Sequence, residues 1–377
     1  MSDPQQPATV PDDGRPLDVF GPDEPRAVPV TRRAALLTFG MLGSAVLLLG
    51  MLLLPVPYAV NGPGPTLNTL GEYDGEPLIS ISGAETYEST GELRLTTVST
   101  TGGPGYPSTL VRVIQGWLSG STQVLPAEYV FPQGATQEQI DEQNQAQMTS
   151  SQENATVAAL EELGYTVPTT MTIAGAVEGG AAEGLLQEGD VLRSVDGTPM
   201  DSYAQLIDLL AETDPGTALT LGIERDGQAT DVTVTTGAKD GGGSQLGVYI
   251  DPDFDLPVDV SIKIEQIGGS SAGTMFALGI IDRLTPQDEA NGAHIAGTGT
   301  MELNGDVGAI GGIRQKMAGA LRDGASWFLA PADNCDEVVG HIPDGLQVTR
   351  IDTLSEARAA VEAIGAGDTA DLPTCTG

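Results

Sequence analysis

A motif of small residues in the last third of the chain could carry a nucleophile. The motif GGSSAG, residues 268–273, follows a segment of alternating apolar residues at 258–264 and precedes an apolar stretch typical of a helix. Glycines let the backbone turn sharply, and the unpaired N–H groups at a helix start can stabilise an oxyanion. We therefore expect Ser271 to be a nucleophile, with an ordinary helix-capping serine as the alternative. The backbone N–H groups expected around the oxyanion are those of Gly269, Ser270 and Ala272.

A second motif supplies a base. In a helix that opens with GGI at 311–313, Lys316 lies along the edge of an apolar face, while Gln315 points toward solvent. The apolar face consists of Ile313, Met317, Ala320 and Leu321. Burial can lower a lysine pKa by about 3–5 units, which yields a neutral amine that acts as a general base near pH 7. We expect Lys316 to take the proton of Ser271, and the alternative is a solvated lysine whose stem alone is covered.

The region 258–330 resembles the proteolytic domain of Lon-type serine proteases. Ser271 stands at the nucleophile position of that family, and Thr298, followed by Gly305 and the GGI motif, matches its second motif. The resemblance implies that Lys316 is the catalytic lysine and that the Thr298 hydroxyl orients it. It also implies assembly into a homo-oligomer.

Two positions depart from the family pattern. Ser270 stands where the family has proline, and Gly268 stands where ATP-dependent members have aspartate. Ser270 is therefore a rival nucleophile. Lys263 is a rival base, although alternation puts it on the polar face of its strand. A Ser–His–Asp triad is a further alternative, but we expect structural or surface roles for His294 and His341.

The middle of the chain resembles a PDZ domain of the kind attached to bacterial proteases. The stretch GGAAEGLLQEGDVLRSVDGTPM at 179–200 carries the likeness. A helix capped by Asp201 and a hairpin over 219–234 follow it. The resemblance implies a small β-barrel over 166–238 that adds a peptide strand to its edge, with 164–167 as a candidate carboxylate-binding loop. A purely structural β-domain is the alternative.

A membrane helix is expected near the N-terminus. Residues 34–54 carry no charge, and a helix of this length reaches roughly 30 Å, the thickness of the hydrocarbon core. Arg32 and Arg33 precede this run, so the positive-inside rule puts the N-terminus in the cytoplasm and residues beyond about 58 outside. A cleaved signal peptide and a buried core helix are the alternatives. Residues 1–33 have the composition of a disordered tail.

An exported location permits disulfides, so Cys335 and Cys375 could pair and tie down the C-terminal tail, 366–377; two free thiols are the alternative. The formal net charge of -36 argues against nucleic-acid binding. The chain has no HExxH, CxxC or Walker A motif, so we expect no metal, no cofactor and no ATP.

Together these features predict an α+β chain: a tail, a membrane helix, residues 55–165 that complete the protease fold, the PDZ-like domain, a glycine-rich linker at 241–244 and a Lon-type domain at 245–365. The expected function is an ATP-independent serine endopeptidase that cleaves exported or membrane-associated polypeptides. A non-catalytic membrane-anchored peptide-binding scaffold and a signal-peptidase-like Ser/Lys enzyme are the alternatives.

Overall fold

The computed structural model describes residues 31–132, 134–239, 242–264 and 267–376. Most of the tail expected at 1–33 therefore lies outside the described residues. The chain divides into two compact units, residues 1–53 and 54–377. It is an α+β protein, with both helices and strands in the second unit.

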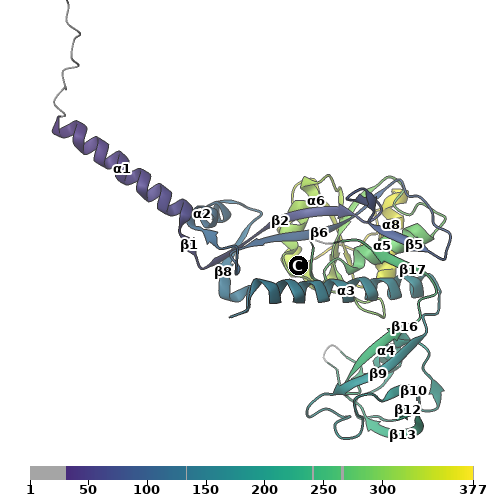
Figure 1. The fold of residues 1–377 in the computed structure, drawn as a ribbon. Helices are drawn as coiled ribbons and strands as arrows, with labels where there is room; N and C mark the ends of the chain where they lie inside the picture. The colour runs from purple at the N-terminus through teal and green to yellow at the C-terminus, as the bar shows by residue number, and fades with distance from the viewer. Residues whose placement is uncertain (1–30, 133, 240–241, 265–266, 377) are drawn as a thin grey trace, which may run out of the picture. The chain divides into compact units, whose positions relative to one another are not determined.

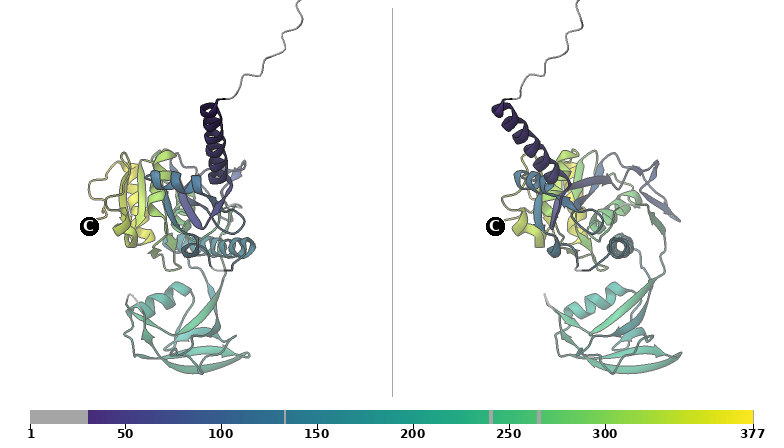
Figure 2. Two further views of the ribbon diagram at one scale, coloured as in Figure 1. Left: turned by 90° about the vertical axis from the view of Figure 1, so that its left-hand side faces the viewer. Right: turned by 60° about the vertical axis from the view of Figure 1, so that its left-hand side comes forward.

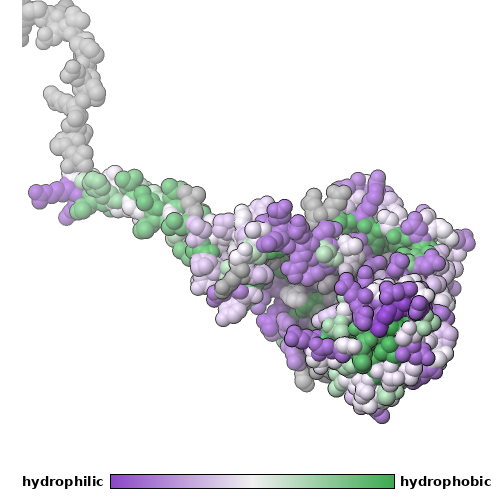
Figure 3. All heavy atoms as spheres, turned by 60° about the horizontal axis from the view of Figure 1, so that its bottom comes forward, coloured by the Kyte–Doolittle hydropathy of each residue, from purple (hydrophilic) through white to green (hydrophobic). Residues whose placement is uncertain are grey.

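The first unit holds the helix α1 (Arg32–Leu53), long and apolar enough to cross a membrane. Thr31 starts it, because its side-chain oxygen accepts a hydrogen bond from the N–H of Ala34, and Pro55 follows its end. The helix begins two residues earlier than expected because Arg32 and Arg33 form its first turn. Figure 3 shows an apolar surface along α1, with hydrophilic side chains only at the end that adjoins the N-terminal segment.

A six-stranded sheet in the second unit joins two distant parts of the sequence. Its order is β22-β21-β18-β6-β2-β8. The strands are β2 (Tyr58–Asn68), β6 (Glu92–Thr101), β8 (Gln123–Pro126), β18 (His294–Gly297), β21 (Trp327–Pro331) and β22 (Gln347–Ile351). Strand β6 pairs in parallel with β18. Residues before the PDZ-like stretch and residues after it thus share one sheet.

Helices pack on this sheet and bury its core. They are α2 (Leu110–Leu118), α3 (Gln137–Glu162), α5 (Gly273–Leu284), α6 (Ile313–Arg322), α7 (Cys335–Val338) and α8 (Leu354–Ala366). Residues Gly273 to Asp282 of α5 are all buried, and α5 packs against both α3 and α8. Thr136 begins α3 with a capping box, in which its hydroxyl and the Gln139 side chain each accept from the other residue's backbone N–H. Figure 1 shows α3 running alongside this part of the unit.

Short elements complete this region. They are β1 (Pro55–Val56), β3 (Glu72–Tyr73), β4 (Glu76–Pro77), β5 (Ile79–Ser82), β7 (Ser108–Thr109), β17 (Asp259–Ile262), β19 (Thr300–Met301), β20 (Val307–Gly308) and the 3-10 turns η1 (Ala127–Tyr129) and η2 (Ala332–Asn334). The alternation read at 258–264 corresponds to β17, which pairs antiparallel with β5. Strand β17 ends at Ile262, and the small-residue motif begins at Gly268.

The PDZ-like region forms a second sheet of order β13-β12-β10-β9-β16, with β11 beside β10 (Figure 2). Its elements are β9 (Thr169–Ala176), β10 (Val191–Val195), β11 (Thr198–Pro199), α4 (Tyr203–Glu212), β12 (Ala218–Arg225), β13 (Gln228–Thr235), β14 (Gly237–Ala238), β15 (Ser244–Gln245) and β16 (Val248–Phe254). The hairpin is confirmed as β12 and β13, which turn at Asp226 and Gly227, both with positive φ. The helix cap is Ser202 rather than Asp201, since the Ser202 hydroxyl accepts from the Gln205 N–H.

The PDZ-like sheet extends beyond the boundary expected at 238. All seven residues of β16 pair with β9, and Val248 and Ile250 pack against the core of this region. Ser244 is buried, with its hydroxyl donating to the carbonyl of Leu210 in α4. The glycine-rich stretch is therefore followed by a strand of the same domain. The composition of 241–244 suggested a linker between domains. The apolar residues of β16 nevertheless pack on the core of the PDZ-like region, so the chain after 244 still belongs to that sheet.

Candidate active site

Helix α3 holds the small-residue loop in place. The backbone N–H of Gly269 donates to the carbonyl of Asn144 at 2.9 Å. Gly268 lies so close that an added Cβ would sit 2.5 Å from the Cβ of Asn144. Gly269 has φ +92°, a conformation that favours glycine. The close approach of α3 thus leaves no room for the aspartate of the family pattern at 268.

Two hydrogen bonds fix the backbone of Ser271 at the entrance to α5. Its carbonyl oxygen accepts from the Thr298 hydroxyl at 2.9 Å and from the Gly299 N–H at 3.0 Å. Ala272 is the N-cap residue of α5, and its carbonyl accepts a hydrogen bond from the Phe276 N–H. Ser271 therefore stands where a buried helix begins, next to N–H groups that have no partner within the helix.

The structure brings Lys316 to Ser271. Lys316 is 2% exposed, and its Nζ lies 2.6 Å from the Ser271 Oγ and 2.8 Å from the Thr298 Oγ1. Removal from water disfavours the ammonium, and this burial lowers the pKa of Lys316 to about 7. The lowered pKa makes the neutral amine, the form that accepts a proton, accessible near neutral pH.

The position of α6 explains the burial of Lys316. The helix packs on β2 and β6, and the Arg322 guanidinium donates to the Gly64 carbonyl of β2 at 2.8 Å. The covered face is wider than helix periodicity suggested: Gln315, which we expected toward solvent, is 5% exposed. Because α6 contacts both β2 and β6, more of its surface is buried than the single apolar face read from the sequence.

The Thr298 hydroxyl contacts both the Lys316 amine and the backbone of Ser271. Because the Thr298 hydroxyl donates a hydrogen bond to the Ser271 carbonyl, its lone pairs remain available to accept a hydrogen bond from Lys316. A neutral lysine that donates to Thr298 keeps its own lone pair for the Ser271 hydroxyl. The three side chains thus form a chain of hydrogen bonds with one self-consistent direction.

The expected oxyanion donors divide into two groups. The Gly269 N–H donates to the Asn144 carbonyl and so holds the loop against α3. Among the described residues, the N–H groups of Ser270, Ser271 and Ala272 donate to no protein acceptor. Of these three residues, Ser271 and Ala272 line the cleft that also contains Lys316, whereas Ser270 does not.

A cleft of about 440 Å³ opens over Ser271 and Lys316. Its walls come from β6, α3 and the small-residue loop, and Lys316 is the charged side chain among the described residues that line it. Asn144 and Met148 are the residues of α3 that line this cleft. The Gln-, Glu- and Ala-rich sequence of α3 does not indicate that this helix contacts a distant loop.

The rival residues lie in other environments. Lys263 is exposed and forms an ion pair with Glu76. His294 Nδ1 lies 3.1 Å from the Glu92 carboxylate, and His341 Nδ1 lies 3.1 Å from the Val339 carbonyl. No hydrogen bond among the described residues joins either histidine to the site.

Ser270, the rival nucleophile, faces a different pocket. This pocket is lined by residues of α3 and by Thr300, Met301 and Glu302, and Lys316 does not line it. The Ser270 carbonyl accepts from the Ser151 hydroxyl of α3 at 3.0 Å. Its backbone thus gives α3 a second hold on the loop.

Cys335 and Cys375 are joined by a disulfide, with their Cα atoms 5.0 Å apart across 40 residues of sequence. The same tail is held by Pro373, whose carbonyl accepts from the Arg350 N–H at 2.9 Å and from the Thr349 hydroxyl at 2.8 Å. The last residues therefore pack on β22.

A groove in the PDZ-like domain lies between α4 and the segment 244–250. Together with residues 302–304 and Asp306, these elements line a cavity of about 610 Å³. Residues 164–167, the expected carboxylate-binding loop, do not line it. Our reading of the sequence missed this groove. The Leu246-Gly247 pair and the alternating residues of β16 after it are the signal that could have indicated it.

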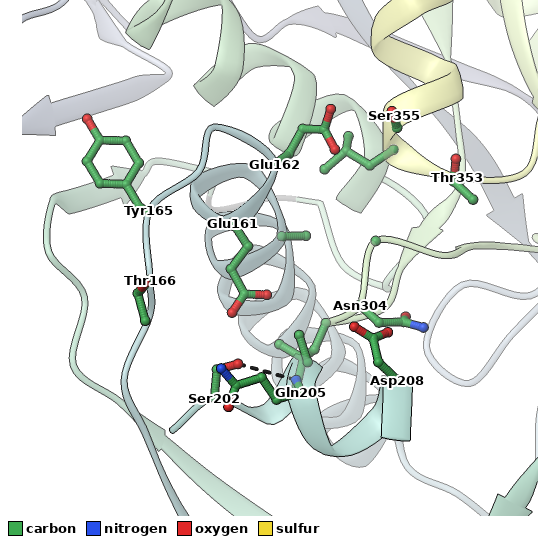
Figure 4. A pocket seen from close by; sticks show the side chains of 15 residues that line it. Glu161, Glu162, Tyr165, Thr166, Ser202, Gln205, Asp208, Asn304, Thr353 and Ser355 are labelled. Carbon is green, nitrogen blue, oxygen red and sulfur yellow. Dashed lines mark hydrogen bonds between the residues drawn. The ribbon is translucent and has the colours of Figure 1, made fainter. Parts of the chain in front are cut away.

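Tyr165 and Thr166 line a separate pocket of about 390 Å³, shown in Figure 4. Figure 4 places Glu161 of α3 in this pocket with Asp208 of α4. Burial, and then the charge of Asp208, raise the pKa of Glu161 to about 7. Neither Ser271 nor Lys316 lines this pocket, so it is separate from the cleft described above.

Comparisons with known proteins identify the two regions. Residues 255–361 match the family described as the Lon protease (S16) C-terminal proteolytic domain, and residues 162–236 match the PDZ domain family. The first match begins just after β16, in agreement with the place of that strand in the PDZ-like sheet.

Similar curated proteins include Lon proteases. The Lon protease of Clostridioides difficile is 34% identical over 102 residues, which covers 26% of this chain and 13% of that protein. Lon protease 1 of Sorangium cellulosum is 36% identical over 108 residues, covering 28% of this chain and 13% of that protein. The chain therefore matches only a small part of these relatives, the C-terminal proteolytic part.

Other similarities are shorter. The periplasmic pH-dependent serine endoprotease DegQ of Escherichia coli is 39% identical over 56 residues, which covers 15% of this chain and 12% of that protein. The crystal structure of the PDZ domain of an SdrC-like protein from Listeria monocytogenes is 16% identical and covers 21% of this chain and 85% of that one, with a TM-score of 0.21.

Proposed function

We propose that this chain, which carries a Lon-type proteolytic domain and a PDZ domain, is a membrane-anchored, ATP-independent serine endopeptidase with a Ser271–Lys316 dyad. One observation carries the proposal: a lysine that is 2% exposed has its amine 2.6 Å from a serine hydroxyl at a helix start. Charged lysines are rarely buried without a carboxylate partner, because their desolvation is costly. A neutral amine next to a hydroxyl is the arrangement that nucleophilic catalysis requires.

The geometry supports acyl transfer to water. Neutral Lys316 accepts the proton of Ser271 while the Oγ forms a bond to a peptide carbonyl carbon. The amides of Ser271 and Ala272, two residues that line the cleft, receive the developing oxyanion. The Lys316 ammonium then protonates the departing amine, and a water molecule hydrolyses the acyl-enzyme with Lys316 again as base. Thr298 holds the amine throughout.

A polypeptide can enter as an extra strand beside β6. Pairing of β6 with β18 ends at Leu95, so the following residues have an open edge among the described strands, and residues 96–100 line the cleft. An open edge pairs readily with an extended peptide, whose carbonyls would then pass Ser271. We infer that the substrate binds there in extended form.

The PDZ domain offers a second open edge. Strand β16 pairs with β9 on one side, and α4 stands across the groove on the other. Peptide strands that add at such an edge give sequence selection through their side chains. We infer that this groove selects the polypeptide for cleavage.

Helix α1 and the disulfide support a place of action outside the cytoplasm. Helix α1 would anchor the chain, with the arginines at its start on the cytoplasmic side and the catalytic domain outside. The Cys335–Cys375 bond fits an oxidising compartment. Exported or membrane-associated polypeptides are then the accessible substrates.

The test is cleavage of an unfolded protein by the full chain in vesicles or detergent, without ATP, with products mapped by mass spectrometry. We expect cleavage by the wild type and by Ser270→Ala, and none by Ser271→Ala or Lys316→Ala. Circular dichroism checks that each variant is folded. Full activity of a folded Ser271→Ala or Lys316→Ala variant would sink the proposal.

A serine-reactive probe separates the enzyme from a peptide-binding scaffold. We expect the probe to label the wild type and to spare Ser271→Ala. Absence of labelling in a folded wild type that still binds peptides would favour the scaffold. A comparison of soluble with membrane-embedded peptides tests the signal-peptidase-like alternative.

A further inference from the structure

Helix α2 and the turns beside it expose large side chains that the proposed protease does not use. The exposed fractions are 70% for Tyr106, 62% for Trp117, 83% for Leu118 and 78% for Tyr129. We call these four side chains the α2 patch. Single exposed apolar residues are common, but a group with three aromatic rings marks a surface that meets something less polar than water.

The four side chains belong to one end of the six-stranded sheet. The ring of Trp117 packs edge-on against Tyr58, the first residue of β2, at 6.1 Å between centroids. The end of β8 lies opposite Tyr58 and leads directly into the turn of Tyr129. Tyr106 is joined to Gly102, whose N–H donates to its carbonyl, and Gly102 abuts the backbone of Tyr58. Figure 1 shows α2, β1 and β8 together at this end.

Along the sequence, only a short connection separates α1 from this end of the sheet. Strand β1 starts at Pro55, two residues after α1 ends, and two residues span at most about 7 Å. Strand β1 pairs with β7, which leads directly into α2. Paired strands lie about 4.8 Å apart. Along the chain, α2 is therefore reached from α1 through one short strand and its paired neighbour.

The charge pattern fits a lipid surface. The chain has 52 acidic residues, yet none occurs from Leu93 to Ala127, the segment that contains Tyr106 and α2, or from Arg26 to Gly71, which contains α1 and β2. Glu128, beside Tyr129, is the first acidic residue after the former segment. The first of these segments carries Arg94 and Arg112. Carboxylates are poorly tolerated next to hydrocarbon and are repelled by anionic lipids, whereas arginine can extend its charged end to the headgroups.

We propose that the α2 patch is a membrane-docking surface that lies in the lipid–water interface. Tryptophan and tyrosine are the side chains enriched at that depth, because each has an apolar ring and a polar group. The inference rests on the proposed anchoring by α1. It adds a second attachment, which restricts how far the catalytic cleft can swing from the bilayer.

The two tryptophans of the chain, Trp117 and Trp327, allow a direct test. Trp327 lies in β21, which three strands separate from β8 in the sheet. The full chain is reconstituted in vesicles of zwitterionic and anionic phospholipid, with or without bromine on the acyl chains. The Trp327→Phe variant reports on Trp117 alone, and Trp117→Phe reports on Trp327 alone.

We expect brominated lipid to quench the emission of Trp117 and to leave that of Trp327 unchanged. Moving from detergent to vesicles should also shift the Trp117 emission to shorter wavelength. Adding Leu118→Glu to the Trp327→Phe variant should reduce the quenching. Leu185→Glu, at a 43% exposed leucine of the PDZ domain, is the matched control and should leave it unchanged.

Resistance of the vesicle-bound protein to alkaline extraction tests anchoring separately. A protein that resists extraction while Trp117 remains unquenched overturns the docking surface but leaves the anchor intact. A protein that is extracted overturns the anchor, and the docking proposal with it. Trp117 emission that shifts with protein concentration in detergent, without quenching by brominated lipid, shows that a second copy covers the patch and also overturns the proposal.

Discussion

The Thr298 hydroxyl accepts a hydrogen bond from the Lys316 amine at 2.8 Å and donates one to the Ser271 carbonyl at 2.9 Å. This relationship fixes both the position of the amine and the direction of its lone pair. An amine held only by packing could rotate its lone pair away from the serine. The hydroxyl of Thr298 thus has a specific positioning role in the proposed mechanism.

Replacing Thr298 by valine keeps the shape of the side chain and removes the hydroxyl. We expect kcat to fall by about 100-fold, the scale for a misplaced catalytic group, with a smaller change in KM. Steady-state cleavage of a fluorogenic peptide measures both constants. Thr298→Ser retains a hydroxyl and should keep most of the activity; equal loss in the serine and valine variants would contradict the positioning role.

The pH dependence of cleavage should report the Lys316 amine. Its pKa is lowered to about 7 by burial, so the amine is charged and inactive below that pH and neutral above it. We therefore expect kcat/KM of the free enzyme to rise with pH through about 7 and then level off. A pH–rate profile between pH 5 and pH 9 tests this expectation.

Lys316→Arg serves as the control for the pH profile. The guanidinium stays protonated throughout this range, so the variant should be inactive at every pH tested. A wild-type profile that is flat across neutral pH would show that the loss of this proton does not limit the reaction.

The contact between α3 and the loop makes Gly268 sensitive to substitution. The Cβ of an alanine at 268 would lie 2.5 Å from Asn144 Cβ, so the loop or the helix must move. We expect Gly268→Ala to lower kcat/KM by about 100-fold, because a shift of about 1 Å at the nucleophile has effects of this size. The matched control is Gly120→Ala, where an added Cβ meets nothing within 4 Å.

Both glycine variants are measured for peptide cleavage and thermal unfolding. Loss of activity in Gly268→Ala at nearly unchanged melting temperature would locate the effect in the loop. Wild-type activity in this variant would mean that the helix yields without disturbing Ser271.

Reduction of the disulfide should destabilise the C-terminal part of the protein. The bond closes a loop between residues 40 apart, and the entropy of such closure corresponds to about 2–4 kcal/mol of unfolding free energy. We expect a Cys335→Ser/Cys375→Ser double variant to unfold at lower urea concentration than the oxidised wild type. Reductant should shift the wild type toward the variant and leave the variant itself unchanged.

Much of the local structure could be predicted from the sequence. The uncharged run after Arg33 and the turn at Asp226-Gly227 were sufficient for α1 and for the β12–β13 hairpin, because helix length and turn geometry are local properties. The motifs around Ser271 and Lys316 were also sufficient to single out those two residues. Helix periodicity even placed Lys316 beside an apolar face.

Tertiary structure alone decided the features that depend on distant segments. The 2.6 Å approach of Lys316 to Ser271 requires α6 to pack on β2 and β6, which come from the other side of the PDZ domain in the sequence. The same applies to the grip of Asn144 on Gly269, which no local pattern signals. Hydrophobic burial and sheet pairing act between surfaces rather than between neighbours in sequence, so a residue's partners, its pKa and its free N–H groups appear only when the chain is folded.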